Sequence, residues 1–166
     1  MATAENLKEA FAGESQAHQT YMAHARKAEA EGYPQVAKLF RAAAEAERVH
    51  AQAHFRVMGG VKGTAENLHA AIDGEASEFR EMYPGFITEA EREGNDKAVM
   101  SFDNALAVEK IHHGLYEEAL KAVGSGQDLP QATMFVCGVC GNTVVGGAPD
   151  SCPICGAPKQ KFFEVE

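Results

Sequence analysis

One short motif occurs twice in the chain, and the two copies are in register. The run Glu-Arg-Val-His at 47–50 recurs as Glu-Lys-Ile-His at 109–112, and a Gly-Glu pair precedes each copy, at 13–14 and at 74–75. Equivalent positions lie 61 or 62 residues apart. On an α-helix, residues three positions apart share one face, so each Glu-x-x-His can direct two ligand atoms to one place. The sequence therefore predicts two similar helix pairs, each with a lone Glu and a Glu-x-x-His.

This set of side chains is the one that holds two metal ions inside a four-helix bundle. Carboxylates bridge the ions and offset their mutual repulsion, while the imidazoles favour iron over magnesium. The alternative is a set of solvated acidic helix faces, which the repetition in register argues against. The candidate metal ligands are Glu14, Glu47, His50, Glu75, Glu109 and His112.

One further candidate has no counterpart in the first repeat. Glu78 lies three residues after Glu75, on the same helical face, whereas the residue three after Glu14 is Ala17. A seventh ligand on one side only would make the two metal positions unequal. The alternative for Glu78 is an ordinary exposed glutamate.

A second kind of metal site is predicted near the C-terminus. Two C-x2-C pairs, Cys137 with Cys140 and Cys152 with Cys155, are separated by eleven residues and contain all four cysteines of the chain. Four thiolates in paired knuckles form a tetrahedral site for zinc or for a single iron ion, and the sequence leaves both metals open. Disulfides are disfavoured because no secretory segment precedes the helical pattern.

Length and charge exclude several classes of function. At 166 residues, the chain has room for one bundle of about 120 residues and a small second domain that needs a metal ion to fold. The formal net charge of −9 disfavours nucleic acids and anionic membranes as partners. No run approaches the roughly 18 consecutive apolar residues of a membrane span.

The helical pattern places these motifs in a mainly α fold. Pro34 and Thr64 stand where helices begin, and Pro84 predicts a kink. The composition of 124–133 predicts a linker, and short strands with knuckle turns follow it. The expected helices cover 3–31, 34–58, 64–93 and 96–123. The predicted domains are a four-helix bundle at 1–123, the linker at 124–133 and a metal-knuckle domain at 134–166.

Several longer stretches make the chain resemble the rubrerythrin family. They are Phe-Ala-Gly-Glu-Ser at 11–15, Gly-Glu-Ala-Ser-Glu at 74–78, Met-Tyr-Pro at 82–84 and Cys-Pro-Ile-Cys-Gly-Ala-Pro-Lys at 152–159, together with both Glu-x-x-His motifs. The resemblance covers nearly the whole chain. It implies a ferritin-like four-helix bundle with a di-iron centre, followed by a rubredoxin-like domain with short strands and one iron ion bound by four cysteines.

The resemblance also implies the ligands of each centre. Carried over position by position, two iron ions are held by Glu14, Glu47, His50, Glu75, Glu78, Glu109 and His112, and one iron ion by Cys137, Cys140, Cys152 and Cys155. Zinc can substitute at either site. In the family, one iron exchanges its bond between the extra Glu and the first His, which are Glu78 and His50 in this chain. Tyr21 and Tyr83 are the implied hydrogen-bond donors beside the ligands.

The activity that the resemblance implies is a non-haem di-iron peroxidase that reduces hydrogen peroxide to water. Such an enzyme protects the cytoplasm against oxidative stress. Electrons would come from an external donor, such as rubredoxin or a NAD(P)H-dependent reductase, and enter through the iron site formed by the four cysteines. No nucleic acid or membrane partner is implied.

Two other functions stay open. The first is a ferroxidase or iron-storage protein, which shares the bundle, although an attached one-electron carrier favours repeated turnover. The second is a binding module in which the cysteines hold zinc and the bundle is a scaffold. A visible absorption spectrum separates the two metals, because ferric iron in four thiolates is red and zinc is colourless.

The short connection between the second and third helices constrains the assembly. In a ferritin-like bundle these helices run parallel. Met58 and Thr64 each lie eleven residues from Glu47 and Glu75, so the connection must span roughly 33 Å along the bundle. Six chain steps span at most about 20 Å. Either the bundle has up-down-up-down topology, or two chains exchange helix pairs in a domain-swapped homodimer, which the resemblance favours.

Overall fold

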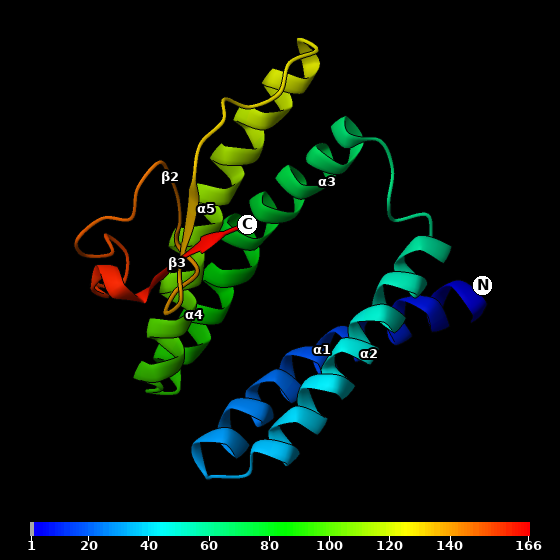
Figure 1. The fold of residues 1–166 in the computed structure, drawn as a ribbon. Helices are drawn as coiled ribbons and strands as arrows, with labels where there is room; N and C mark the ends of the chain where they lie inside the picture. Colours follow the sequence, from blue (N-terminus) through cyan, green and yellow to red (C-terminus); the bar gives the residue numbers. More distant parts are fainter. Residues whose placement is uncertain (1) are drawn as a thin grey trace. The chain divides into compact units, whose positions relative to one another are not determined.

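The computed structural model describes residues 2–166, and helices dominate it (Figure 1). The expected mainly α fold with a small β-containing C-terminal domain is confirmed, and the outer helix bounds agree with the sequence prediction to within one residue. No helix among these residues is long and apolar enough to cross a membrane. The elements are α1 (Ala2–Ala30), α2 (Pro34–Val57), α3 (Thr64–Ser77), η1 (Glu78–Met82), α4 (Tyr83–Arg92), α5 (Asp96–Gly124), β1 (Met134–Cys137), β2 (Thr143–Val145), η2 (Lys159–Lys161) and β3 (Phe162–Val165).

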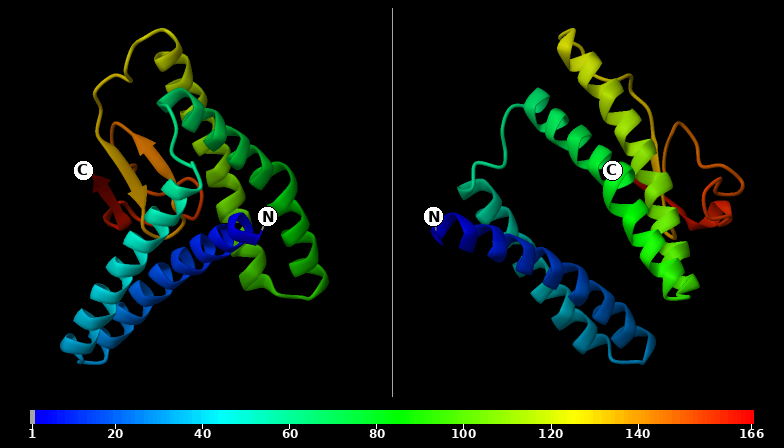
Figure 2. Two further views of the ribbon diagram at one scale, coloured as in Figure 1. Left: turned by 90° about the vertical axis from the view of Figure 1, so that its right-hand side faces the viewer. Right: turned by 180° about the vertical axis from the view of Figure 1, so that it is seen from behind.

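The chain divides into two compact units, Met1–Lys62 and Gly63–Glu166. The first unit is a helical hairpin in which α1 and α2 lie side by side (Figure 1, Figure 2). Its buried residues are small alanines, which recur every seven positions on α2. Because a methyl side chain lets two helices approach closely, the hairpin has a thin core. The buried alanines are Ala25 and Ala28 on α1 and Ala37, Ala44 and Ala51 on α2.

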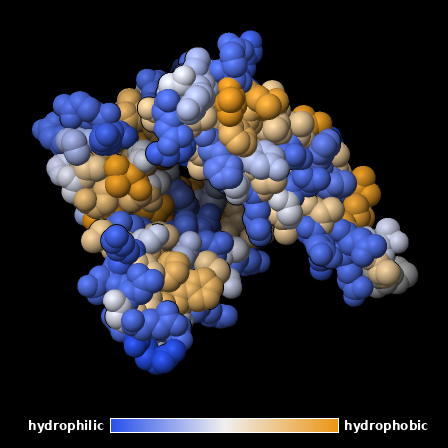
Figure 3. Space-filling model, turned by 90° about the horizontal axis from the view of Figure 1, so that it is seen from below, coloured by the Kyte–Doolittle hydropathy of each residue, from blue (hydrophilic) through white to orange (hydrophobic). Residues whose placement is uncertain are grey.

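Large apolar side chains remain exposed on this hairpin. Leu39 is 68% exposed, and Val36, Val49 and Val57 are also exposed. Figure 3 shows hydrophobic patches among hydrophilic ones on the face of the molecule that it presents. Two helices alone bury too little apolar surface to be stable in water, so the hairpin needs further packing partners.

The second unit repeats this architecture with an interrupted helix. The elements α3, η1 and α4 follow one another and pack against α5. Each repeat has a hollow, one beside the end of α1 and the other beside the end of α4. The residues that line the two hollows correspond in pairs, 62 positions apart, so the two repeats have the same local fold here. The pairs are His24 with Phe86, Lys27 with Glu89, Ala28 with Ala90, Glu31 with Glu93, Tyr33 with Asn95, Val36 with Ala98, and Phe40 with Phe102.

The interruption, η1, is a π-helix, and it explains why the repeat spacing changes. Glu14 and Glu75 are 61 residues apart, whereas Tyr21 and Tyr83 are 62 apart. The backbone N–H of Tyr83 donates to the carbonyl of Glu78, five residues back, so the turn contains one extra residue. The π turn absorbs the insertion and returns Tyr83 to the position that Tyr21 has in the first repeat.

The sequence predicts a kink at Pro84, and the structure has a π turn in the residues just before it. Pro84 is the second residue of α4, directly after the π turn. Because proline has no N–H, the carbonyl of Arg80 lacks the donor that an α-helix would supply. The sequence prediction identified the residue that disturbs the helix but missed the π geometry.

The C-terminal sheet belongs to the second unit. Its three strands are antiparallel in the order β2-β1-β3. Cys137 at the end of β1 and Cys152 are buried, and Ile154, Ala157 and Phe162 pack around the cysteines. The strand β2 contacts α5, which brings the cysteine domain next to the last helix.

Deleting Glu81 tests the role of η1. We expect this variant to fold, because the π turn relaxes to an α-helix while the flanking segments keep their faces. Helix content measured by circular dichroism should stay unchanged, and the thermal midpoint should move by less than about 4 °C. Deleting Glu45, an exposed residue within the regular helix α2, is the control. That deletion turns the following residues by about 100° and should unfold the hairpin. Equal destabilisation of the two variants would contradict this role.

Candidate metal centres

In the first unit, the predicted residues Glu14, Glu47 and His50 converge. One ligand atom from each lies within 4.8 Å of the others. The His50 Nδ1 atom is 3.1 Å from Glu47 Oε2 and 3.7 Å from Glu14 Oε1. A hydrogen bond between the two carboxyls raises the pKa of Glu14 and lowers the pKa of Glu47. A metal ion placed between these atoms would be bound by two carboxylates and one imidazole.

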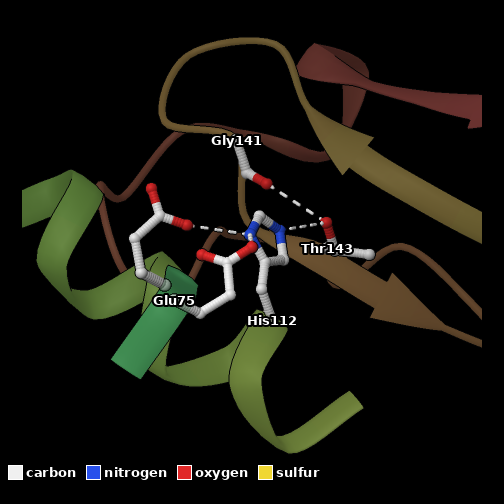
Figure 4. A network of polar contacts seen from close by, with 5 residues as sticks. Glu75, His112, Gly141 and Thr143 are labelled. Atoms are coloured by element: carbon white, nitrogen blue, oxygen red, sulfur yellow. Dashed lines mark hydrogen bonds and ion pairs between the residues drawn. The ribbon is translucent and has the colours of Figure 1, made fainter. Parts of the chain in front are cut away.

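In the second unit, Glu75, Glu109 and His112 form the equivalent cluster, and these side chains are more buried. The His112 Nδ1 atom is 2.9 Å from Glu109 Oε2 and 3.9 Å from Glu75 Oε1 (Figure 4). Burial, followed by repulsion from Glu109, raises the pKa of Glu75 to about 7. A divalent cation between these atoms would remove the repulsion, and both clusters therefore fit the carboxylate and histidine half-sites that the sequence predicts.

Glu78 lies beside the second cluster without joining it. It is absent from the group of converging ligand atoms. Its pKa is raised by burial and then by the charge of Glu109, while His112 opposes the shift, so the carboxyl lies within electrostatic reach of both residues. Its place in the first turn of η1 gives this carboxyl a backbone setting that no residue of α1 has. Its role as a seventh ligand stays a prediction.

The two tyrosines predicted beside the ligands occupy equivalent positions. Tyr21 packs against Phe40 and Tyr83 packs against Phe102, each with ring centroids 6.2 Å apart. Burial raises the pKa of Tyr83, and the charges of Glu109, Glu78 and Glu75 raise it further. The Tyr83 hydroxyl therefore lies near the carboxylates of the second cluster and keeps its proton at neutral pH.

The four cysteines are free thiols that converge within 4.8 Å. The Sγ atoms of Cys137 and Cys155 are 3.8 Å apart, and those of Cys140 and Cys152 are 3.6 Å apart. A tetrahedron with metal–sulfur bonds of about 2.3 Å has edges of about 3.8 Å, so the sulfurs are spaced for one tetrahedral metal ion.

Hydrogen bonds favour the thiolate form of one of these cysteines, Cys152. Burial of Cys152 disfavours the thiolate, but the backbone N–H groups of Cys155 and Ile154 outweigh this effect and lower its pKa to about 7. The Asn142 side chain, only 2% exposed, directs Nδ2 toward Cys152 Sγ at 3.7 Å. Sequence analysis missed Asn142. The available signal was a polar side chain immediately after the first knuckle.

Several histidines outside these clusters make packing contacts. His18 Nδ1 lies 2.8 Å from the carbonyl of Ala44, which ties α1 to α2. His24 contacts the Phe40 ring edge-on, and His113 contacts Phe79 in the same way. None of the three belongs to a group of converging ligands among residues 2–166.

The raised pKa of Glu75 predicts how the metal-free protein responds to pH. Because its folded-state pKa of about 7 exceeds the ordinary 4.5, Glu75 favours the fold below about pH 4.5, and this contribution is lost as pH rises through about 7. After metal removal with a chelator, the thermal midpoint should fall across this window. Glu75→Gln stays neutral and should flatten the profile, whereas Glu118→Gln, at an exposed site on α5, should keep the wild-type slope. A wild-type slope in Glu75→Gln would contradict the assignment.

Comparison with known proteins agrees with these two kinds of site. The family model for rubrerythrin matches residues 5–120, and the model for the rubrerythrin rubredoxin-like domain matches residues 135–163. Rubrerythrin-2 of Clostridium acetobutylicum is 36% identical, over 96% of this chain and 95% of the relative. Nigerythrin of Nitratidesulfovibrio vulgaris is 37% identical, over 96% of this chain and 85% of the relative.

Solved structures give the same assignment. The match with a mixed-valence structure of nigerythrin covers 98% of this chain and 86% of the nigerythrin chain, with 35% identity and a TM-score of 0.57. The fully reduced, all-ferrous structure of nigerythrin has 34% identity and a TM-score of 0.59. A di-iron carboxylate and histidine site and a rubredoxin-like site of four cysteines are therefore both indicated. The chain belongs to the rubrerythrin family, and this membership implies an oxidoreductase.

Proposed function

We propose that this chain is a non-haem di-iron peroxidase that reduces hydrogen peroxide to water. The observation that carries the proposal is the contact between β2 of the cysteine domain and α5, the helix that presents Glu109 and His112. A one-electron carrier beside a ligand-bearing helix suits a metal centre that is reduced again in every cycle. A ferroxidase or storage protein, which only oxidises iron, has no need of such a carrier.

The proposed di-iron ligands are the seven residues named from the sequence, of which six lie in the two convergent clusters. When bound, the two iron ions act as Lewis acids and together supply two electrons for cleavage of the O–O bond. Glu78 lies outside the group of converging ligand atoms, and its carboxylate would be the seventh ligand when iron is bound. The proposed ligands are Glu14, Glu47, His50, Glu75, Glu78, Glu109 and His112.

Protons must accompany the electrons, because peroxide takes up two protons for each pair of water molecules formed. Tyr83 retains its proton next to the carboxylates of the second cluster. Its hydroxyl can therefore donate a hydrogen bond, or a proton, to a peroxide oxygen that lies near Glu75 and Glu78. The equivalent residue Tyr21 lies next to Phe40, and we propose the same donor role for it on the first side.

The proposed assembly is a domain-swapped homodimer. Each unit of the chain contributes three converging ligands, which is half of the set that a di-iron centre needs. The connection from Val57 to Thr64 is short, and the hairpin leaves apolar side chains exposed. Both features favour pairing of the hairpin of one chain with the second unit of its partner.

Electrons are proposed to come from an external rubredoxin or a NAD(P)H-dependent reductase, and the cytoplasm is the proposed location.

Iron in the four cysteines distinguishes this function from a binding module that holds zinc. Metal analysis of protein made with adequate iron should find about three iron ions per chain, and ferric protein should be red.

Peroxide consumption with an external donor tests the function. Glu109→Ala should lower turnover by about 100-fold or more, because losing a ligand costs at least as much as losing a residue that supports one. Cys155→Ser should retain iron in the carboxylate clusters and still stop turnover from the external donor. Glu118→Ala, an exposed position on α5, is the matched control. Wild-type turnover in Cys155→Ser would show that electrons bypass the cysteine site and would refute this route.

Co-refolding of Glu47→Ala chains with Glu109→Ala chains tests the exchange of helix pairs. In a swapped heterodimer, one site has both damaged residues and the other has neither. Random pairing makes half of the dimers heterodimers, so about a quarter of the wild-type activity should return. Mass spectrometry must show the heterodimer. A mixture with heterodimers present and no more activity than its parents would rule the exchange out.

A further inference from the structure

The cysteine domain contacts α5 at a site where one hydroxyl meets a proposed iron ligand. The His112 Nε2 atom lies 2.9 Å from the Thr143 Oγ1 atom, and both residues are partly buried (Figure 4). Thr143 is the first residue of β2, and the sequence analysis did not single it out. All of these atoms belong to the second unit of the chain.

This contact determines which nitrogen of His112 carries the proton. The Nδ1 atom faces Glu109 and Glu75, so Nδ1 is the nitrogen that would bind a metal ion and must lack a proton there. A neutral imidazole then carries its proton on Nε2, which donates to Thr143 Oγ1. A hydroxyl that accepts this hydrogen bond fixes both the tautomer and the orientation of the ring.

The same hydroxyl is itself held by the first cysteine knuckle. The Thr143 hydroxyl donates to the carbonyl of Gly141 at 3.3 Å, and Gly141 directly follows Cys140. The Gly141 N–H donates to the carbonyl of Cys137 at 2.8 Å. Gly141 has φ +84°, which favours glycine, and a β-carbon there would lie 3.8 Å from the Val108 side chain. Val108 is only 2% exposed, so the knuckle packs closely against α5 one turn before His112.

Among the described residues of its hairpin, His50 of the first repeat has no such support. The His50 side chain is 56% exposed, compared with 26% for His112. Among the described residues of the hairpin, the contacts of His50 are made by Nδ1, to Glu47 and Glu14. The two histidines of the duplicated motif therefore differ in the hydrogen bond to Nε2.

We propose that Thr143 is a positioning residue that holds His112 as a fixed ligand and joins the cysteine knuckle to the di-iron half-site of the same chain. The inference rests on the proposed function only in taking His112 as an iron ligand. Hydrogen bonds connect the backbone after Cys140 to the His112 ring through this single hydroxyl. His112 is thereby restrained, while residues 2–62 of the hairpin place no equivalent restraint on Nε2 of His50.

The test compares Thr143→Val, which removes the hydroxyl and keeps the shape, with Thr143→Ser, which restores a hydroxyl. Thr133→Val is the matched control, because Thr133 is an exposed threonine directly before β1 whose hydroxyl donates to the carbonyl of Gly146. Iron affinity of the carboxylate and histidine site is measured on the full chain by competition with a chelator. Thr143→Val should weaken binding by about 10- to 100-fold, and Thr143→Ser and Thr133→Val should bind like wild type.

A spectroscopic measurement separates positioning from general packing. In full-length protein loaded with diamagnetic zinc, the His112 Nε2 proton should give a slowly exchanging imidazole N–H resonance by NMR. We expect the resonance in wild type, Thr143→Ser and Thr133→Val, and expect it to be lost in Thr143→Val. Unchanged iron affinity together with an unchanged resonance in Thr143→Val would overturn the proposal.

These readouts do not depend on peroxide turnover. If wild-type protein failed to reduce peroxide while affinity and resonance changed as expected, the peroxidase proposal would fail and the role of Thr143 would stand. If turnover were normal but Thr143→Val matched Thr133→Val in both measurements, only the role of Thr143 would fail.

Discussion

The structure depends on gathering carboxylates that repel one another. Glu75 and Glu109 lie in one partly buried cluster, and the pKa of Glu75 is raised to about 7 as a result. Folding without a cation therefore keeps a carboxyl protonated near neutral pH. Metal ions replace this repulsion by attraction between cation and carboxylates. The free energy of metal binding at each cluster therefore also stabilises the helix pair that carries it.

Much of the fold could be predicted because the chain contains its pattern twice. Glu47 with His50 and Glu109 with His112 are each three residues apart, and this spacing placed both motifs on helices whose bounds the structure reproduces. The paired cysteines were equally informative, because two C-x2-C pairs predict one tetrahedral metal site, and the four sulfurs do converge in the structure. The exact domain boundaries and the individual ligand roles stay predictions.

What could not be predicted depends on contacts between distant segments. The π turn at Glu78 is visible only as a one-residue change in repeat spacing, which a sequence pattern does not connect with hydrogen bonding. Asn142 and Thr143 gain their roles from Cys152 and His112, which lie 10 and 31 residues away in the chain. Such roles follow from packing, so no local periodicity indicates them.

The π turn also has a genetic consequence. Two half-sites copied from one helix pair would begin with the same backbone, and a single inserted codon between Glu78 and Tyr83 is enough to make the two backbones differ. The insertion changes the backbone at Glu78, and every later position of the repeat stays on the same helical face as its counterpart in the first repeat. Loss of the same codon would return this backbone to a regular helix in one mutational event, while Glu78 would still have Ala17 as its counterpart in the first repeat.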